Sequence, residues 1–202
     1  MRHVVENLRR RGLGPPLPRP LGALCPHRRE GAFVSRRPGL KPFFLIAVLF
    51  ALADQVIKQI VGKTFALGDS VAVIPGFFNL VHLRNPGGAF SILDGLPPLW
   101  GRLFFICATL AALAFVLYLY RTHSPGNLWA KAGMMLVFGG GLGNLVDRVA
   151  YGEVIDYLLF YYGQYHWPAF NLADSGITVG VGLMIVDLLR GTPESASSRG
   201  GG

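Results

Sequence analysis

Apolar residues gather in four stretches of the chain, and each is close to the ~20 residues that a helix needs to cross a lipid bilayer. The stretches are residues 42–62, 103–120, 129–146 and 177–189, the last extended backwards by residues 170–176. The 103–120 stretch carries no charged side chain at all. The pattern predicts an all-α membrane protein with four transmembrane helices.

The first apolar stretch also has features of a cleaved signal peptide. Residues 43–50 are uniformly apolar, and Ala51-Leu52-Ala53 has the small residues of a signal-peptidase cleavage site. The polar region before this run is too long for a signal peptide, and apolar residues continue at helical spacing after Ala53. We therefore interpret the stretch as a retained membrane helix, with cleavage as the alternative.

The two longer segments between the predicted helices, residues 63–102 and 147–169, differ in kind. The first holds two β-favouring runs, 71–73 and 77–81, separated by Pro75-Gly76, which predicts a small antiparallel sheet or cradle on the outer membrane surface. The second is rich in aromatic residues, which settle at the membrane–water interface. We interpret these rings as an aromatic belt; they are Tyr157, Phe160, Tyr161, Tyr162, Tyr165 and Trp167.

Composition supports a membrane protein. Of the 202 residues, 51% are hydrophobic and 15% are charged, whereas soluble domains carry about 25% charged residues. These values exclude a disordered protein and argue against a soluble globular enzyme. Because Cys107 lies within an apolar stretch and Cys25 lies far outside it, we expect neither a disulfide framework nor a cysteine-ligated metal site.

The net charge of +8 lies entirely in residues 1–41, which hold nine arginines and Lys41 against Glu6 and Glu30. We expect this segment to be a disordered cytoplasmic tail, residues 42–190 to form the membrane domain, and residues 191–202 to be a flexible tail. No aromatic or motif pattern accompanies the arginines, so contact with anionic lipid is favoured over nucleic-acid binding. The positive-inside rule then places both termini in the cytoplasm and both long loops outside.

Several polar residues fall inside the apolar stretches, where each ionisable group is costly. Asp54 and Lys58 are four positions apart and share a helix face, so we expect them to pair and to fix helix packing. Gly139 and Gly143 have a spacing that lets helices approach closely. Three further polar residues share a face at the end of the third stretch; they are Asn144, Asp147 and Arg148.

Asp156 follows the third stretch and Asp174 precedes the fourth, with no complete membrane crossing between them. The fold must therefore place both carboxylates at the same outer boundary, together with Asn171. From the spacing alone, two interpretations stay open. The aspartates form a catalytic pair, or they are solvated groups that cap a helix, because the dipole of a first helical turn favours negative charge.

Other chemistries have little support. The five histidines are scattered without a His-Glu-x-x-His pattern, and no Gly-x-Ser-x-Gly motif is present. The sequence therefore predicts no metal and no cofactor.

Five ordered blocks resemble the bacterial lipoprotein signal peptidase family, signal peptidase II, across residues 43–190. They are DQVIK at 54–58, NPGGAF at 85–90, GNLVDR at 143–148, VIDY at 154–157 and FNLADS at 170–175. This chain departs from the family in its long basic tail and in Pro86, where a small or polar residue is commoner.

The resemblance implies a membrane aspartic endopeptidase that removes the signal peptide from diacylglyceryl-modified prolipoproteins, cutting before the lipidated cysteine. It implies a monomer in the bacterial inner membrane, contact with lipid, and an active site on the extracytoplasmic face. Asp156 and Asp174 match the catalytic aspartates. Asn85, Asn144, Arg148 and Asn171 match polar positions around the substrate site, and Asp54, Lys58, Gly87, Ala89 and Asp147 match further motif positions.

Two rival interpretations come from the same polar residues. A small transporter or channel would use Asp54, Lys58, Asp147 and Arg148 as an ion path, although the four stretches share no repeat. A membrane scaffold without enzyme activity would use the glycines for packing and the aspartates as caps.

Overall fold

The computed structural model describes residues 39–87, 97–122 and 128–190. All four predicted apolar stretches are helices, which are α2 (Leu40–Thr64), α3 (Pro98–Thr122), α4 (Leu128–Ala150) and α5 (Leu172–Arg190). Residues 1–38 of the tail predicted at 1–41, the predicted tail at 191–202, and Ala89 lie outside the described residues. Leu40 and Lys41, which the prediction gave to the first tail, belong to α2.

Three of these helices, α2, α3 and α5, are long and apolar enough to cross a membrane. Many of their large apolar side chains point outward, as lipid-facing residues do; examples are Leu45, Leu49, Leu52, Leu110, Phe115 and Leu188. The structure is therefore a mostly helical membrane protein with three candidate spans. The fourth predicted span, α4, is not among them.

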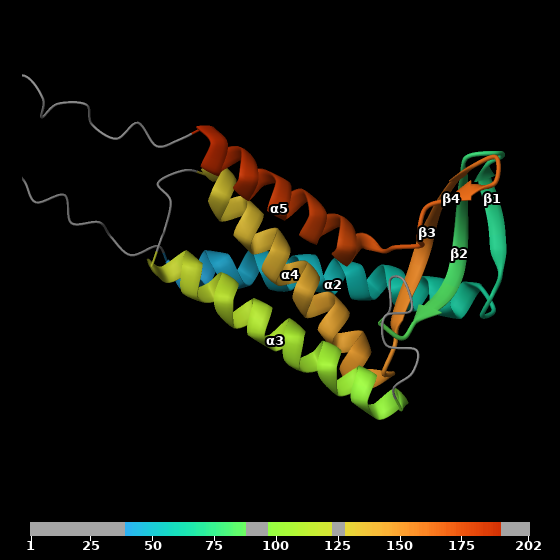
Figure 1. The fold of residues 1–202 in the computed structure, drawn as a ribbon, viewed down its shortest axis with the longest axis horizontal. Helices are drawn as coiled ribbons and strands as arrows, with labels where there is room; N and C mark the ends of the chain where they lie inside the picture. The colour runs from blue at the N-terminus through green and yellow to red at the C-terminus, as the bar shows by residue number, and fades with distance from the viewer. Residues whose placement is uncertain (1–38, 88–96, 123–127, 191–202) are drawn as a thin grey trace, which may run out of the picture. The chain divides into compact units, whose positions relative to one another are not determined.

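Helix α4 is less apolar than a typical span because it carries Lys131, Asn144, Asp147 and Arg148 together with several glycines. It packs against α2, α3 and α5 and lies between α3 and α5 in Figure 1. Its polar residues and glycines are largely buried against these neighbours. Low hydropathy in α4 therefore reflects contact with protein in place of lipid.

The glycines of α4 allow this close packing. A Cβ atom on Gly139 would lie 2.7 Å from the backbone oxygen of Ala47, and one on Gly143 would lie 2.7 Å from Asp54 Oδ2. Any larger residue would push α4 away from α2. The close approach predicted from the spacing of Gly139 and Gly143 is confirmed.

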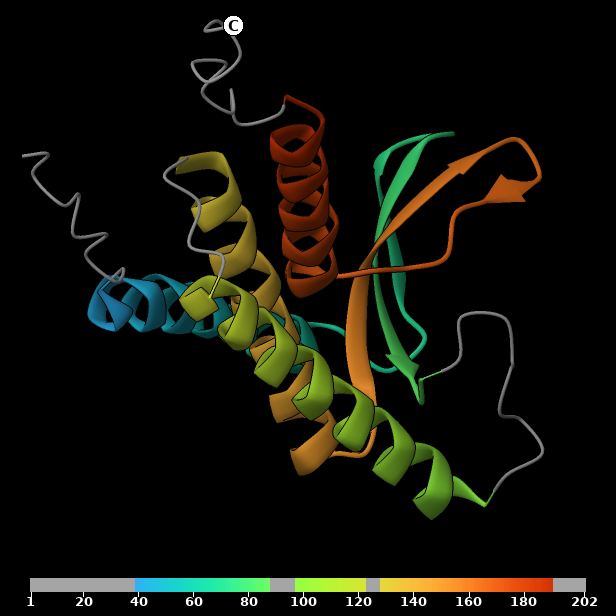
Figure 2. The same ribbon diagram turned by 60° about the vertical axis from the view of Figure 1, so that its left-hand side comes forward.

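A four-stranded antiparallel sheet lies at the end of the helices where α5 begins (Figures 1 and 2). Its strands, in the order β1-β2-β3-β4, are β1 (Ser70–Ile74), β2 (Phe78–Asn85), β3 (Val154–Tyr162) and β4 (Tyr165–His166). The predicted hairpin of β1 and β2 is confirmed, and Gly76 in its turn has a φ of +81°.

The segment between α4 and α5 contributes strands β3 and β4, where the sequence predicted only an aromatic belt. The side chains of Tyr162, Tyr165 and Trp167 are exposed, and for these three residues the belt stays a prediction. Phe160, by contrast, is a sheet residue that stacks on Phe78 with ring centroids 4.8 Å apart. Aromatic residues favour both interfaces and strands, so composition alone does not separate the two roles.

The register of β2 on β3 positions the functional residues. Leu83 pairs with Asp156, and Asn85 pairs with Val154, so the end of β2 lies beside the start of β3. A register shift between Leu80 and Leu83 interrupts the ladder just before this point. Irregular pairing of this kind re-aims side chains next to active sites.

Candidate active site

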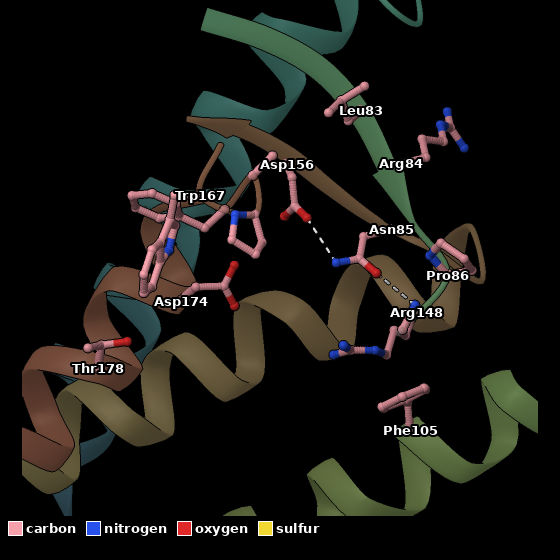
Figure 3. Close-up of a pocket in the computed structure, with 14 residues that line it drawn as sticks. Leu83, Arg84, Asn85, Pro86, Phe105, Arg148, Asp156, Trp167, Asp174 and Thr178 are labelled. Atoms are coloured by element: carbon pink, nitrogen blue, oxygen red, sulfur yellow. Dashed lines mark hydrogen bonds between the residues drawn. The ribbon is translucent and has the colours of Figure 1, made fainter. Parts of the chain in front are cut away.

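Asp156 on β3 and Asp174 in the first turn of α5 line the same cavity, of about 690 Å³. Figure 3 shows both carboxylates turned toward the space between β2, α4 and α5. The other residues that line it are Leu83, Arg84, Asn85, Pro86, Gly87, Phe105, Arg148, Trp167, Pro168, Ala169, Phe170 and Thr178. The fold thus brings the two aspartates together, as the topology of the chain requires.

Asp174 also caps α5. Its backbone N–H donates to Asn171 Oδ1 at 3.0 Å, and its Oδ2 accepts from the Asn171 backbone N–H at 3.2 Å. This reciprocal arrangement is a capping box, with asparagine and aspartate in the places of serine and glutamate. The capping interpretation is therefore confirmed for Asp174, whereas Asp156 is a buried strand residue that is neither solvated nor a cap. For Asp174, capping does not compete with a catalytic role, because its carboxylate still faces the cavity.

Each aspartate is oriented by asparagine side chains. Asn171 Nδ2 donates to Asp156 Oδ1 at 2.8 Å, and Asn85 Nδ2 donates to Asp156 Oδ2 at 3.1 Å. Asn144 Nδ2 donates to Asp174 Oδ1 at 2.8 Å. Asn171 therefore touches both carboxylates, one through its side-chain amide and the other through its capping bonds. These bonds fix the direction in which each carboxylate faces the cavity.

Asp156 sits in a strongly perturbed environment. Its side chain is buried, with the residue 3% exposed. Burial, together with the nearby charge of Asp174, raises the pKa of Asp156 from 3.8 to about 6, against the opposing hydrogen bonds from Asn85 and Asn171. Burial and a like charge both disfavour ionisation of a carboxyl group, so Asp156 holds its proton well above the usual pH range.

This burial predicts a pH-dependent stability. The folded protein binds the Asp156 proton more tightly than the unfolded chain, so stability falls as pH rises from 3.8 to about 6 and levels off above. Asp156→Asn has no such proton to lose. We therefore expect the free energy of unfolding of the variant minus that of wild type to increase by about 3 kcal/mol between pH 3.8 and about pH 6. Thermal unfolding of both proteins in detergent between about pH 4 and pH 7 measures the difference. A difference that stays constant with pH would contradict the assignment.

Lys58, Asp54 and Asp147 form a buried ion cluster next to the asparagines that hold the two cavity aspartates. Lys58 Nζ is 2.8 Å from Asp54 Oδ2 and 2.9 Å from Asp147 Oδ2, and its side chain is 0% exposed. The predicted pairing of Asp54 with Lys58 is confirmed. Asp147 joins this pair from α4, and it also accepts a hydrogen bond from Gln55. Sequence spacing placed Asp147 on one face with Asn144 and Arg148 but gave no sign of its contact with Lys58, because that contact joins two helices.

This cluster orients the groups around the aspartates. Lys58 Nζ donates to Asn144 Oδ1 at 2.9 Å, so the Nδ2 group of Asn144 is turned toward Asp174. Asp54 Oδ1 accepts from the backbone N–H of Ala173 at 2.9 Å, and Asp147 Oδ2 accepts from that of Ile155 at 3.2 Å. Ala173 precedes Asp174 and Ile155 precedes Asp156. The cluster thus holds the two chain segments that carry the aspartates.

Arg148 diverges from Asp147 and lines the cavity (Figure 3). Its guanidinium carbon lies 5.2 Å from the centroid of the Phe105 ring. Among the described residues, its buried Nε atom has no hydrogen-bond partner. A guanidinium with free donors beside two carboxylates is suited to binding a carbonyl oxygen or an oxyanion.

Two contacts of the site had no sequence signal. Tyr157, which we interpreted as a belt residue, is 4% exposed, so for this residue the belt is wrong. The Tyr157 hydroxyl accepts a hydrogen bond from the Leu172 backbone N–H at 3.0 Å and so helps to satisfy the first turn of α5. Phe105 is one phenylalanine in a uniformly apolar run, and its contact with Arg148 depends on how α3 packs on α4. Neither contact follows from residue spacing.

Comparison with known proteins gives consistent matches. The family model described as signal peptidase (SPase) II matches residues 46–190. A protein named lipoprotein signal peptidase from Syntrophus aciditrophicus is 44% identical over 154 residues, which cover 76% of this chain and 96% of the relative. Another from Cupriavidus taiwanensis is 48% identical over 144 residues, covering 71% of this chain and 80% of the relative.

Solved structures also match. A bacterial membrane enzyme determined by the in meso method at 2.3 Å resolution has a TM-score of 0.69 at 36% identity, covering 82% of this chain and 98% of that one. A second, at 1.9 Å resolution, has a TM-score of 0.67 at 38% identity, covering 77% of this chain and 97% of that one.

Proposed function

This chain belongs to the signal peptidase II family of membrane aspartic peptidases, and from that premise we propose that Asp156 and Asp174 cut the signal peptide from lipid-modified prolipoproteins. The observation that carries the proposal is the position of both carboxylates in one cavity, each fixed by asparagine side chains. Because the pair lies where the outer sheet meets the start of α5, it can reach a peptide bond at the membrane surface.

In the proposed reaction the pair shares one proton. Asp156, the more buried member, keeps the proton and polarises the scissile carbonyl, and ionised Asp174 draws a proton from the attacking water. The water oxygen bonds to the carbonyl carbon and forms a tetrahedral oxyanion. Collapse of this intermediate breaks the C–N bond, and the new amine takes up a proton from the pair. The nearby charge of Asp174 helps Asp156 to keep that proton, because a like charge disfavours ionisation of a carboxyl group.

We propose that Arg148 donates hydrogen bonds to the carbonyl oxygen of the scissile bond or to the oxyanion that forms from it. Asn144 is engaged on both sides of its amide, by Lys58 and by Asp174, and Asn171 is engaged by Asp156 and by its capping bonds. These two asparagines are also 4% and 0% exposed. We therefore propose that Asn144 and Asn171 orient the aspartates. The Asn85 amide is also bonded at both ends, to Asp156 and to the Gly87 N–H, but Asn85 is only half-buried and lines the cavity. We propose that Asn85 and Arg148 reach the substrate from the cavity wall.

The proposal is tested with purified protein in detergent. A prolipoprotein whose cysteine carries a diacylglyceryl group is incubated with the enzyme, in parallel with the same protein left unmodified. We expect a shortened product from the lipid-modified substrate alone, with the new N-terminus at the modified cysteine. Absence of that product from a correctly folded preparation would refute the proposed function.

We further propose that α4 is a fourth crossing and that both termini are cytoplasmic, in a monomer of the inner membrane. At 1.5 Å per residue, a helix of the length of α4 spans ~35 Å, enough for the hydrocarbon core. Asn144 and Asp147 are buried and bonded to Lys58 of α2, and Arg148 lines the cavity, which lowers the cost of these groups in the membrane. The excess of basic residues in the N-terminal segment supports this orientation.

Orientation can be measured by labelling single cysteines in a chain from which Cys25 and Cys107 have been removed. We expect a membrane-impermeant maleimide to label Asp69→Cys in intact spheroplasts, because Asp69 precedes β1. Arg121→Cys, in the last turn of α3, should react only after the membrane is permeabilised. The reverse pattern would overturn the proposed orientation.

The transporter alternative needs Lys58 and its partners to form an open ion path. Lys58 instead has three close partners, Asp54, Asp147 and Asn144, and it is inaccessible to solvent. A closed cluster of this kind supports a structural role.

A further inference from the structure

Phe105 of α3 contacts both Arg148 of α4 and the turn at Gly87 that follows β2. It belongs to α3, and its ring lies under the guanidinium of Arg148 from α4 (Figure 3). It also lines the cavity together with Gly87, which follows β2. Other phenylalanines of α3 behave differently, since Phe104 and Phe115 are 55% and 59% exposed. Phe105 is therefore the α3 phenylalanine that turns inward.

The contact with Arg148 has a specific advantage for a group that must bind substrate. At 5.2 Å from the ring centroid, the guanidinium is within the range of a cation–π attraction. A carboxylate partner would hold Arg148 by engaging its N–H donors. An aromatic face holds the charge without accepting those hydrogen bonds, so the donors stay available for an oxygen in the cavity.

The same ring supports the turn that carries Asn85. A Cβ atom on Gly87 would overlap the Phe105 ring, and the φ of Gly87 is +118°, a conformation that favours glycine. The Gly87 N–H donates to Asn85 Oδ1 at 2.9 Å, and Asn85 Nδ2 donates to Asp156 Oδ2. The backbone at Gly87 thus contacts the Phe105 ring. Through its hydrogen bond to Asn85, the position of Gly87 also affects the hydrogen bond from Asn85 to Asp156.

We propose that Phe105 is a positioning residue of this active site, which holds the Arg148 guanidinium and the turn from Asn85 to Gly87 against the cavity. The inference rests on the proposed function, since it assigns Phe105 a role in that reaction. Phe105 acts through Arg148 and Asn85 and does not take part in proton transfer. Its loss should therefore affect the transition state more than the binding of the lipid-modified substrate.

The kinetic test compares Phe105→Leu with Phe105→Tyr and with Phe115→Leu, a matched change on the same helix at an exposed position. We expect kcat of Phe105→Leu to fall about tenfold, the size of a cation–π contribution in a partly desolvated site, with KM within about twofold of wild type. Phe105→Tyr keeps the aromatic face and should restore most of kcat. Phe115→Leu should match wild type. Wild-type kcat in folded Phe105→Leu would overturn the proposal.

A second measurement does not depend on the peptidase activity of the protein. Thermal unfolding of wild type, Phe105→Leu, Arg148→Gln and the double variant forms a double-mutant cycle. We expect Phe105→Leu to lower the unfolding temperature less when Arg148 is already replaced, because the contact is then lost. Equal shifts in both backgrounds would show that the ring only fills space, and would overturn the proposal. An inactive wild type would instead refute the proposed function, while the cycle would still report on the contact.

Discussion

Asp174→Asn is expected to lower turnover of a lipid-modified prolipoprotein by at least ~10³-fold, while the protein stays folded and inserted in the membrane. Asparagine cannot accept a proton from water, so the base of the pair is lost. It still offers Oδ1 to Asn144 Nδ2, the contact that Asp174 makes at 2.8 Å. The Nδ2 group of asparagine cannot accept the Asn171 backbone N–H that Asp174 Oδ2 accepts at 3.2 Å, which costs about 1 kcal/mol of stability. The expected loss of turnover is far larger than this and is therefore mainly chemical. Product formation per mole of purified enzyme measures it, alongside the thermal unfolding temperature of each protein.

Asp156→Asn should give a loss of similar size, since both members of the pair are required. The matched control is Asp187→Asn, the same chemical change near the other end of α5, outside the cavity that holds the pair. Its turnover should be close to that of wild type. If either Asp156→Asn or Asp174→Asn turned over substrate at the wild-type rate, the two-aspartate mechanism would be wrong.

The sequence predicts the helices well because each depends on a local pattern. A long apolar run gives a membrane helix wherever it occurs, and the turn at Pro75-Gly76 between β-favouring runs gives a hairpin. Both signals are contained within a short part of the chain. The helix ends in the structure extend the predicted ones by a few residues, since apolarity marks the lipid-facing part of a helix and not its first and last turns.

Strand β3 shows the limit of such patterns. It pairs with β2, whose Leu83 lies opposite Asp156 although the two are far apart in sequence. Nothing local distinguishes a strand of aromatic residues from an aromatic belt, because the same side chains suit both. The pairing is decided by packing, in which Phe160 stacks between Phe78 and Phe170 with centroid distances of 4.8 and 5.8 Å.

The active site was predictable in outline and not in detail. Topology required Asp156 and Asp174 to lie at one boundary, yet spacing left capping and catalysis as alternatives. Asp174 serves the first role and is positioned for the second, since a capping box places its carboxylate at the start of α5, beside the cavity. The contacts that orient the pair, such as Lys58 with Asn144, join separate helices and depend on how α2 packs against α4.

Lys58→Met is expected to destabilise the protein by about 3–5 kcal/mol, the cost of leaving buried charges without their partner. Methionine fills a similar volume but offers no charge and no donor. Asp54 and Asp147 would then face each other across a site that is 0% exposed. Because these carboxylates hold the backbone of Ala173 and Ile155, the segments carrying the catalytic pair would loosen as well. A lower yield of folded protein and a lower unfolding temperature measure the effect.

Two further variants separate charge from packing. Lys63→Met makes the same change on α2 at an exposed position, and it should leave the unfolding temperature nearly unchanged. A triple variant, Lys58→Met with Asp54→Asn and Asp147→Asn, removes all three charges while keeping acceptors for the two backbone N–H groups. It should recover part of the lost stability, since a neutral buried cluster has no unpaired charge. If Lys58→Met alone unfolded at the wild-type temperature, the ion cluster would not be what holds α2, α4 and the catalytic segments together.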